Sequence, residues 1–230
     1  MSESIINDIA SGRYAFGRGN AKFRQALRSI GYDLSGACLG GASLRKADLS
    51  KTIMKGANLG GADLGECLLC RAYLRGANMG GANMGYAKLA EADLETANLG
   101  GANAGYADFS RTDLRGANMS GAYLGYAKFY KAVLADVYAW GAFLRGSDIR
   151  FADLRGAYLK GADLKGADMR YAKFYGADLR GANLVGAEIS KGSLKDFVVA
   201  IGALERGDTA RYDHDTKILL KKVGVTVDGN

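Results

Sequence analysis

A large apolar residue recurs at every fifth position through most of the chain. Of the 33 positions between Leu34 and Leu194 whose numbers end in 4 or 9, 21 are Leu, five Met, three Phe, two Ile and two Ala. Ala stands two residues before 26 of these positions, and Asp or Asn lies between the two in 18 of the 33 units. The chain therefore repeats the unit Ala-(Asp/Asn)-Leu-x-x without an insertion.

A period of five fits neither an α-helix, whose faces recur at a period of about 3.6, nor a long β-strand, whose faces alternate at every second position. Within Ala-(Asp/Asn)-Leu, however, apolar, polar and apolar residues alternate. This alternation predicts a three-residue strand whose two ends point inward. The x-x pair is rich in Gly, which is typical of a tight corner. A chain that alternates strands and corners in this way winds as a coil.

The corner residues indicate how many units make one coil. Gly-Gly pairs stand at 40/41, 60/61, 80/81 and 100/101, and Gly-Tyr pairs at 85/86, 105/106 and 125/126. Both kinds of pair recur at every fourth unit, which predicts four units per coil, a square cross-section and about eight coils. The fold class is therefore all-β, a parallel β-helix with a core of Leu and Ala. Side chains one coil apart should stack, so Tyr86, Tyr106 and Tyr126 would form an aromatic ladder and Asn58, Asn78, Asn98 and Asn118 an amide ladder.

The repeat is absent from residues 1–31, which we expect to form an N-terminal cap. Ser4 can cap a short helix that ends at Gly12, and residues 20–30 carry Phe23, Leu27 and Ile30 at helical spacing. An irregular first coil around Phe16 and Phe23 is the alternative.

Towards the C-terminus the register persists weakly, so we assign residues 32–204 to the coil and 205–230 to a C-terminal cap. A short helix is expected over 217–223, followed by a strand over 225–227. This element predicts either a monomeric cover for the open edge of the last coil or a homodimer interface. The candidate interface residues are Ile218, Leu219, Leu220, Val223, Val225 and Val227.

The repeated unit resembles the pentapeptide repeat family. The resemblance extends over all the units up to Leu194, which make up most of the chain, and it implies a right-handed quadrilateral β-helix. The C-terminal sequence ILLKKVGVTVDG is loosely similar to the end of the quinolone-resistance branch, whose members protect topoisomerases. Those members are thought to imitate the negative charge of duplex DNA, whereas this chain has a net charge of +7.

Composition excludes several classes of site. With a single His, His214, and a lone Cys67-Leu68-Leu69-Cys70 pair, neither a catalytic triad nor a metal or redox centre is expected. We therefore predict no enzyme activity and no cofactor. The chain has three Cys and neither a secretory signal nor a run of 18 apolar residues, which favours the cytoplasm and argues against membrane insertion.

The outward residues around 123–175 are unusually aromatic. Exposed Trp and Tyr accompanied by Arg are common anchors of protein interfaces. The candidate partner-binding residues are Tyr123, Tyr126, Tyr130, Tyr138, Trp140, Phe143, Phe151, Tyr158, Arg150 and Arg170.

Three functions remain open from the sequence. The first is a scaffold that presents a rigid surface to a protein partner. The second is a protein that interacts with DNA gyrase or another topoisomerase and gives resistance to quinolone-like inhibitors. The third is nucleic-acid binding through a basic face, since basic residues exceed acidic ones.

Overall fold

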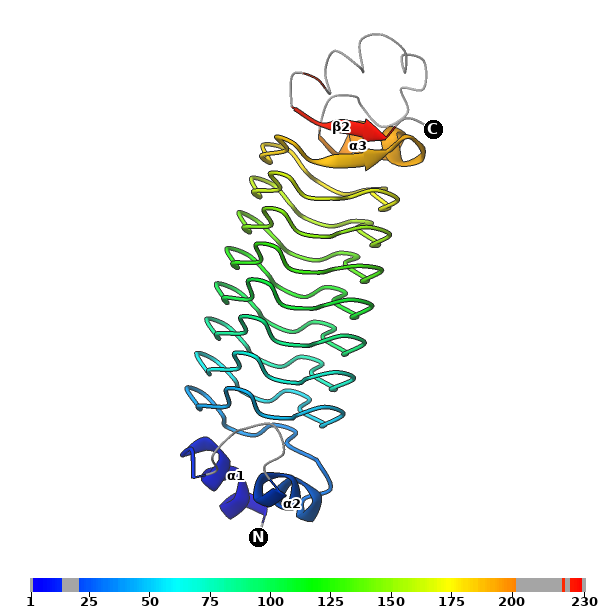
Figure 1. Ribbon diagram of the computed structural model, residues 1–230. Coiled ribbons are helices and arrows are strands. Elements are labelled where there is room, and N and C mark those ends of the chain that lie inside the picture. Colours follow the sequence, from blue (N-terminus) through cyan, green and yellow to red (C-terminus); the bar gives the residue numbers. More distant parts are fainter. Residues whose placement is uncertain (1, 14–20, 202–220, 222–223, 229–230) are drawn as a thin grey trace.

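The protein forms a long stack of coils with a helical cap at its N-terminal end (Figure 1). The computed structural model describes residues 2–13, 21–201, 221 and 224–228. Helices α1 (Ser2–Ala10) and α2 (Ala21–Ser29) lie at one end of the coils. At the other end lie strand β1 (Glu188–Ser190), the 3-10 helix η1 (Lys191–Ser193), helix α3 (Leu194–Ala200) and strand β2 (Thr226–Asp228).

Parallel backbone pairing defines each coil. The middle residue of every unit pairs with the residue 20 positions later, from Asp33 with Ile53 to Asp168 with Glu188. The N–H of Leu34 donates to the carbonyl of Ile53 at 2.7 Å, and the N–H of Ile53 donates to the carbonyl of Tyr32 at 2.9 Å. The predicted arrangement of four units per coil is confirmed. We number the four faces by the first residue of each column of middle residues: Asp33 for face 1, Cys38 for face 2, Ser43 for face 3 and Asp48 for face 4.

The interior is filled by the apolar residues of the repeat, as expected. Leu34, Leu114 and Ala162, for example, have no solvent exposure. At several positions where the repeat usually has an inward Ala, the residue is polar but its hydroxyl group is hydrogen-bonded. The hydroxyl groups of Thr52, Thr112 and Ser147 donate to backbone carbonyls at 2.7–2.8 Å. Because each buried hydroxyl has an acceptor, these substitutions do not leave an unpaired polar group in the core.

The second residue of each corner adopts a left-handed backbone. Gly101 has a φ of 62° and Tyr86 a φ of 60°. Gly adopts this conformation without the penalty that a Cβ atom incurs, which explains why Gly is so frequent at this position.

The predicted aromatic ladder occupies such corners, between faces 3 and 4. The rings of Tyr86 and Tyr106 stack with centroids 5.0 Å apart, and those of Tyr106 and Tyr126 with centroids 5.1 Å apart. The next residue in the column is Gly146. A Cβ atom there would lie 2.5 Å from Cε1 of Tyr126, so the absence of a side chain gives the Tyr126 ring its space.

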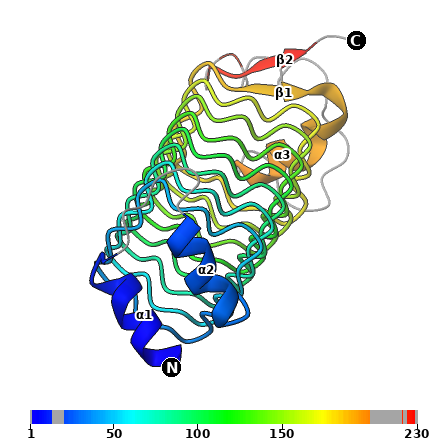
Figure 2. The same ribbon diagram turned by 60° about the horizontal axis from the view of Figure 1, so that its bottom comes forward.

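Two helices form the N-terminal cap (Figure 2). Helix α1 begins at Ser2, slightly before the expected cap residue Ser4, and α2 coincides closely with the predicted segment 20–30. Ile9 from α1 and Phe23 and Leu27 from α2 are buried with the core of the coil. The helices thus continue the core, and the alternative of an irregular coil around Phe23 does not hold for residues 21–29. Phe16 lies outside the described residues.

At the C-terminal end the coil stops earlier than expected. Residues 194–200, which we assigned to a last coil, form α3 instead. The sequence there has Gly192 in place of the inward Ala, and Phe197 lies fully buried with its ring 5.2 Å from that of Phe174, in an edge-on contact. Helix α3 thus places a bulky residue over the end of the core, where a further three-residue strand would leave an open edge.

The exposed backbone edge of the last coil is partly covered. Strand β2 pairs in parallel with β1, with Ile189 opposite Val227, and the N–H of Leu179 donates to the carbonyl of Ala200 at 2.8 Å. Covering an edge in this way removes a template for end-to-end association. Strand β2 is the expected strand over 225–227, shifted by one residue. The predicted helix over 217–223 lies outside the described residues, Lys221 excepted.

Replacing the inward Leu114 with Asp should abolish cooperative folding. The substitution places a carboxylate in a fully buried site without a partner, at a cost well above the ~1.5–3 kcal/mol that a buried Leu contributes. Thermal unfolding followed by circular dichroism measures the effect. Ile53→Asp is the matched control, because Ile53 is at an outward position where the repeat usually has Asp or Asn, and we expect it to change stability by less than about 0.5 kcal/mol. A normal melting curve for Leu114→Asp would contradict the inward assignment.

Replacing Gly146 with Ala should destabilise the coil more than replacing Gly166 with Ala. Both glycines have a φ of 65°, so each variant incurs the left-handed cost of roughly 1–2 kcal/mol. A Cβ at Gly166 meets nothing within 4 Å, whereas one at Gly146 displaces the Tyr126 ring. Urea unfolding measures both free energies. In a Tyr126→Ala background the two substitutions should cost the same, and a persistent difference there would show that the ring is not the cause.

Candidate functional site

Face 2 begins with a regular amide ladder. The side-chain N–H groups of Asn78, Asn98 and Asn118 each donate to the Oδ1 atom of the preceding Asn at 3.0 Å, starting from Asn58. Each Oδ1 also accepts the backbone N–H two residues later, as Asn58 does from Gly60 at 3.1 Å. The predicted ladder is confirmed, and its amides are largely satisfied by one another.

The same column then changes from Asn to aromatic residues. Tyr138 follows Asn118, and its ring stacks on that of Tyr158 with centroids 5.0 Å apart. Trp140 stands at the corner between faces 2 and 3 and is 58% exposed. Beyond this corner, on face 3, the rings of Tyr123 and Phe143 lie 5.6 Å apart and are also exposed. We call Tyr123, Tyr138, Trp140, Phe143 and Tyr158 the aromatic surface.

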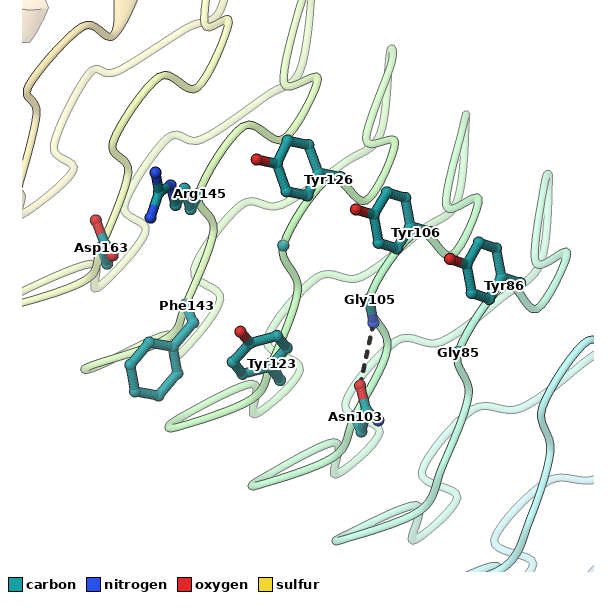
Figure 3. Close-up of a pocket in the computed structure, with 11 residues that line it drawn as sticks. Gly85, Tyr86, Asn103, Gly105, Tyr106, Tyr123, Tyr126, Phe143, Arg145 and Asp163 are labelled. Atoms are coloured by element: carbon teal, nitrogen blue, oxygen red, sulfur yellow. Dashed lines mark hydrogen bonds between the residues drawn. The ribbon is translucent and has the colours of Figure 1, made fainter.

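A groove runs along face 3 beside the aromatic surface (Figure 3). Its volume is about 360 Å³. Tyr86, Tyr106 and Tyr126 form one wall and Tyr123 and Phe143 the other, with Gly85 and Gly105 between them (Figure 3). Gly125 also lines the groove. We call this feature the tyrosine groove. The sequence analysis missed it, although the three Gly-Tyr pairs supply both a wall and the base.

The remaining candidate residues gather elsewhere. Phe151 stands at the corner between faces 4 and 1, where its ring contacts those of Tyr130 and Tyr171 with centroids 5.6 Å and 4.7 Å apart. Arg150 and Arg170 lie at the same corner. In a four-sided coil this corner is diagonally opposite the one that carries Trp140. The ten predicted residues therefore form two groups rather than one patch. The first is the aromatic surface with Tyr126 beside it, and the second contains Tyr130, Arg150, Phe151 and Arg170.

Many arginines of the coil are neutralised within their own unit. Where Asp occupies the middle position and Arg follows two residues later, the guanidinium reaches back to the carboxylate. Arg155 Nε lies 2.8 Å from Asp153 Oδ1, and Arg180 Nη2 lies 2.7 Å from Asp178 Oδ2. The hydrogen bond from each Arg lowers the pKa of the adjacent Asp carboxyl group below its usual value. The same pairing occurs at Asp113, Asp148 and Asp168 with Arg115, Arg150 and Arg170.

Arg71, Arg111 and Lys131 form a basic column at the corner between faces 4 and 1, which is also partly paired. Arg71 Nε donates to Glu91 at 2.7 Å, and Arg111 lies 3.8 Å from the same carboxylate. Most arginines of the repeats therefore take part in ion pairs.

The two cysteines of the CxxC sequence lie in different environments. Cys67 is buried and its thiol approaches the carbonyl of Leu44 at 2.7 Å, while Cys70 is partly exposed at a corner. Burial raises the pKa of the Cys67 thiol to about 12. A thiol that stays protonated at neutral pH is a poor nucleophile and a poor metal ligand.

One group of carboxylates comes close enough to consider as a cation site. Asp93, Glu95 and Asp113 bring one oxygen atom each within 4.8 Å of one another. Arg115 pairs with both Glu95 and Asp113, and Arg75 also pairs with Glu95. These guanidinium groups already balance much of the negative charge, so the group is an ion-pair network.

Most of the predicted dimer interface lies outside the described residues. This applies to Ile218, Leu219, Leu220 and Val223. Val225 is buried within the chain, so it supports the cap, and Val227 belongs to β2. Among the helices in the described part of the chain, none is long and apolar enough to span a bilayer.

Several solved structures are similar to this chain. HetL, a pentapeptide repeat protein involved in the regulation of heterocyst differentiation in the cyanobacterium Nostoc sp. strain PCC 7120, is 31% identical over 69% of this chain and 73% of its own, with a TM-score of 0.45. QnrB1, a plasmid-mediated fluoroquinolone resistance protein, is 17% identical over 75% of this chain and 89% of its own, with a TM-score of 0.39. A pentapeptide repeat protein from the Arabidopsis thaliana thylakoid lumen is 22% identical over 64% of this chain and 87% of its own, with a TM-score of 0.40.

No curated protein matches the chain in sequence. The family model described as pentapeptide repeats, in contrast, matches it in eight copies, the first starting at residue 33 and the last ending at residue 196. These matches cover the same residues whose backbone pairs from coil to coil. The chain belongs to the pentapeptide repeat family, whose repeats wind into a right-handed β-helix.

Proposed function

We propose that this protein is a non-enzymatic scaffold that binds a protein partner through the aromatic surface. One observation carries the proposal. Five large aromatic side chains, between 40% and 58% exposed, meet on two adjacent faces around Trp140. Pentapeptide repeat proteins are generally binding scaffolds, which agrees with this function.

The backbone beneath the aromatic surface is suited to binding. The N–H of Tyr138 donates to the carbonyl of Ala117, and its carbonyl accepts from Met119, at 2.9 Å and 2.6 Å. The strand is thus held to the coil before it. A surface held in this way loses little conformational freedom on association, which favours affinity. Trp and Tyr are also the residues most enriched among those that dominate binding energies.

The distribution of charge argues against the two alternatives. Nucleic-acid binding requires cations that are available to phosphates, whereas five arginines of the coil are engaged by an Asp of their own unit. A surface that imitates duplex DNA requires carboxylates that are not neutralised, and these pairs remove five of them. Topoisomerase protection and nucleic-acid binding therefore remain outcomes for the experiment to detect. Location in the cytoplasm and homodimer formation remain predictions from the sequence.

Removing the indole of Trp140 should weaken partner binding strongly. A photo-crosslinking amino acid at position 160, exposed in the same corner column one coil beyond Trp140, captures and identifies the partner in cells. The purified partner is then titrated against the wild type and Trp140→Ala by calorimetry. We expect at least ~30-fold weaker binding, because a central anchor contributes about 2 kcal/mol or more. Tyr73→Ala is the matched control, since Tyr73 is 55% exposed on face 1, away from the aromatic surface, and should bind normally.

Two results would contradict the proposal. One is equal affinity of the wild type and Trp140→Ala for the captured partner. The other is rescue of DNA gyrase supercoiling from a fluoroquinolone by both proteins alike, which would favour the topoisomerase alternative. Retention on duplex DNA that disappears between low and high salt in both proteins would indicate nucleic-acid binding instead.

A further inference from the structure

The tyrosine groove presents ring edges rather than ring faces. Tyr106 is stacked between Tyr86 and Tyr126, with ring planes 3° and 11° from parallel (Figure 3). Both faces of the Tyr106 ring are therefore occupied, and its edge and hydroxyl group remain available. Nucleobases bind single-strand proteins by stacking on aromatic faces. A wall of edges fits aliphatic side chains and an extended backbone better.

Two backbone donors are left without an acceptor along the groove. The N–H of Gly85 donates to Asn83 at 3.3 Å, and that of Gly105 donates to Asn103 at 3.4 Å. In the next two coils Tyr123 and Phe143 replace Asn, so this acceptor is missing. Among the described residues, the N–H groups of Gly125 and Arg145 have no partner. Gly125 is buried, and an unpaired buried donor is costly unless an acceptor from outside reaches it.

Unpaired positive charge lies at the same end of the groove. Arg145 and Lys165 follow Gly125 in one column, and neither side chain has an ion pair in the part of the chain that the structure describes. Asp163 lines the same end of the groove, and it accepts hydrogen bonds from Asn183 Nδ2 at 2.9 Å and from the N–H of Lys165 at 3.1 Å.

The opposite end of the column differs. Arg45, which begins it, is paired with Glu66, and Lys46 Nζ lies 3.7 Å from the same carboxylate. The column is therefore neutralised at its N-terminal end and cationic at the other, and the groove is lined mainly by aromatic rings and glycines, together with Asn103, Arg145 and Asp163. This asymmetry specifies a ligand with an apolar part and a negative charge at one end.

We infer that the tyrosine groove binds an extended peptide segment of a partner protein, with a carboxylate at one end of the segment held by Arg145. The inference rests on the proposed scaffold function and specifies the kind of segment that is bound. Three coil steps from Tyr86 to Arg145 span about 15 Å, the length of roughly five extended residues. The segment's carbonyl groups accept from the N–H groups of Gly125 and Arg145. Its apolar side chains lie between the two aromatic walls.

Selection from a random heptapeptide library displayed on phage tests this inference with the intact protein. The library is enriched on the wild type, and the enriched sequences are synthesised and titrated by calorimetry. We expect enriched peptides to combine apolar residues with Asp or Glu towards one end. Arg145→Gln should weaken their binding at least ~10-fold, because it removes a charge-assisted hydrogen bond. Binding to the wild type should also weaken as salt increases.

Two variants serve as matched controls. Arg155→Gln removes a guanidinium at the corner diagonally opposite the groove, and Tyr73→Ala removes an exposed ring from the opposite face; both should bind the peptides normally. Tyr106→Ala tests the wall of the groove, with circular dichroism to verify that it folds, and should bind more weakly. Since Arg145 is exposed, Arg145→Gln provides a test that does not depend on the fold.

The inference is overturned if no peptide is enriched above the bare support, or if the enriched peptides lack acidic residues or bind Arg145→Gln normally. Some enriched peptides could lack acidic residues or bind Arg145→Gln normally, yet bind Trp140→Ala more weakly than the wild type. That result would overturn peptide binding in the groove but would still support the scaffold function. An oligothymidine that binds more tightly than every peptide and depends on Arg145 would replace the peptide with a single-stranded nucleic acid.

Discussion

Parallel backbone pairing between residues 20 positions apart is the constraint on which the whole structure depends. Each middle residue donates to and accepts from the two residues that flank its counterpart in the preceding coil, as Asn58 does with Ala37 and Leu39, so the period cannot drift without breaking these bonds. The core maintains the same period, because Leu114 and its equivalents point into a narrow, close-packed interior. Every outward side chain therefore lies in a column, directly between its counterparts in the two neighbouring coils.

Because of these columns, equivalent side chains on successive coils can contact one another. A residue type that interacts with itself along a column produces a ladder, as Asn78 does through its amide and Tyr106 through its ring. A pairing that fits inside one unit, such as Asp153 with Arg155, recurs on other faces without needing a neighbour. The ladders and pairs satisfy most polar groups locally. Surface that can bind something else is found where a column changes its residue type.

The sequence was sufficient to predict the four-sided coil, because few other folds combine a period of five residues with corners that repeat at every fourth unit. The ladders of Tyr86 and Asn58 followed, since stacking depends on the column alone. The opposite corners of Trp140 and Phe151 were also within reach of the spacing, because the two residues are about half a coil apart; treating residues 123–175 as one region overlooked this. The groove also escaped prediction, since its volume depends on how the Tyr126 ring lies over Gly146. Helix α3 replaced a coil because Phe197 covers the end of the core, which is a tertiary effect.

Both candidate binding features arise from the same substitution. On face 3, Asn103 Nδ2 donates to Asn83 at 3.5 Å. When Tyr123 takes the place of Asn in this column, these amide contacts end, a ring is exposed, and the N–H of Gly125 loses its acceptor. Tyr138 ends the neighbouring ladder on face 2 in the same manner, beside Trp140. An aromatic residue at a middle position thus adds apolar area and a backbone donor together, which are the two components that an extended peptide requires. In a repeat this regular, the aromatic departures locate the binding surface: Tyr123, Tyr138, Phe143 and Tyr158 lie on faces 2 and 3, and only Tyr73 lies on face 1.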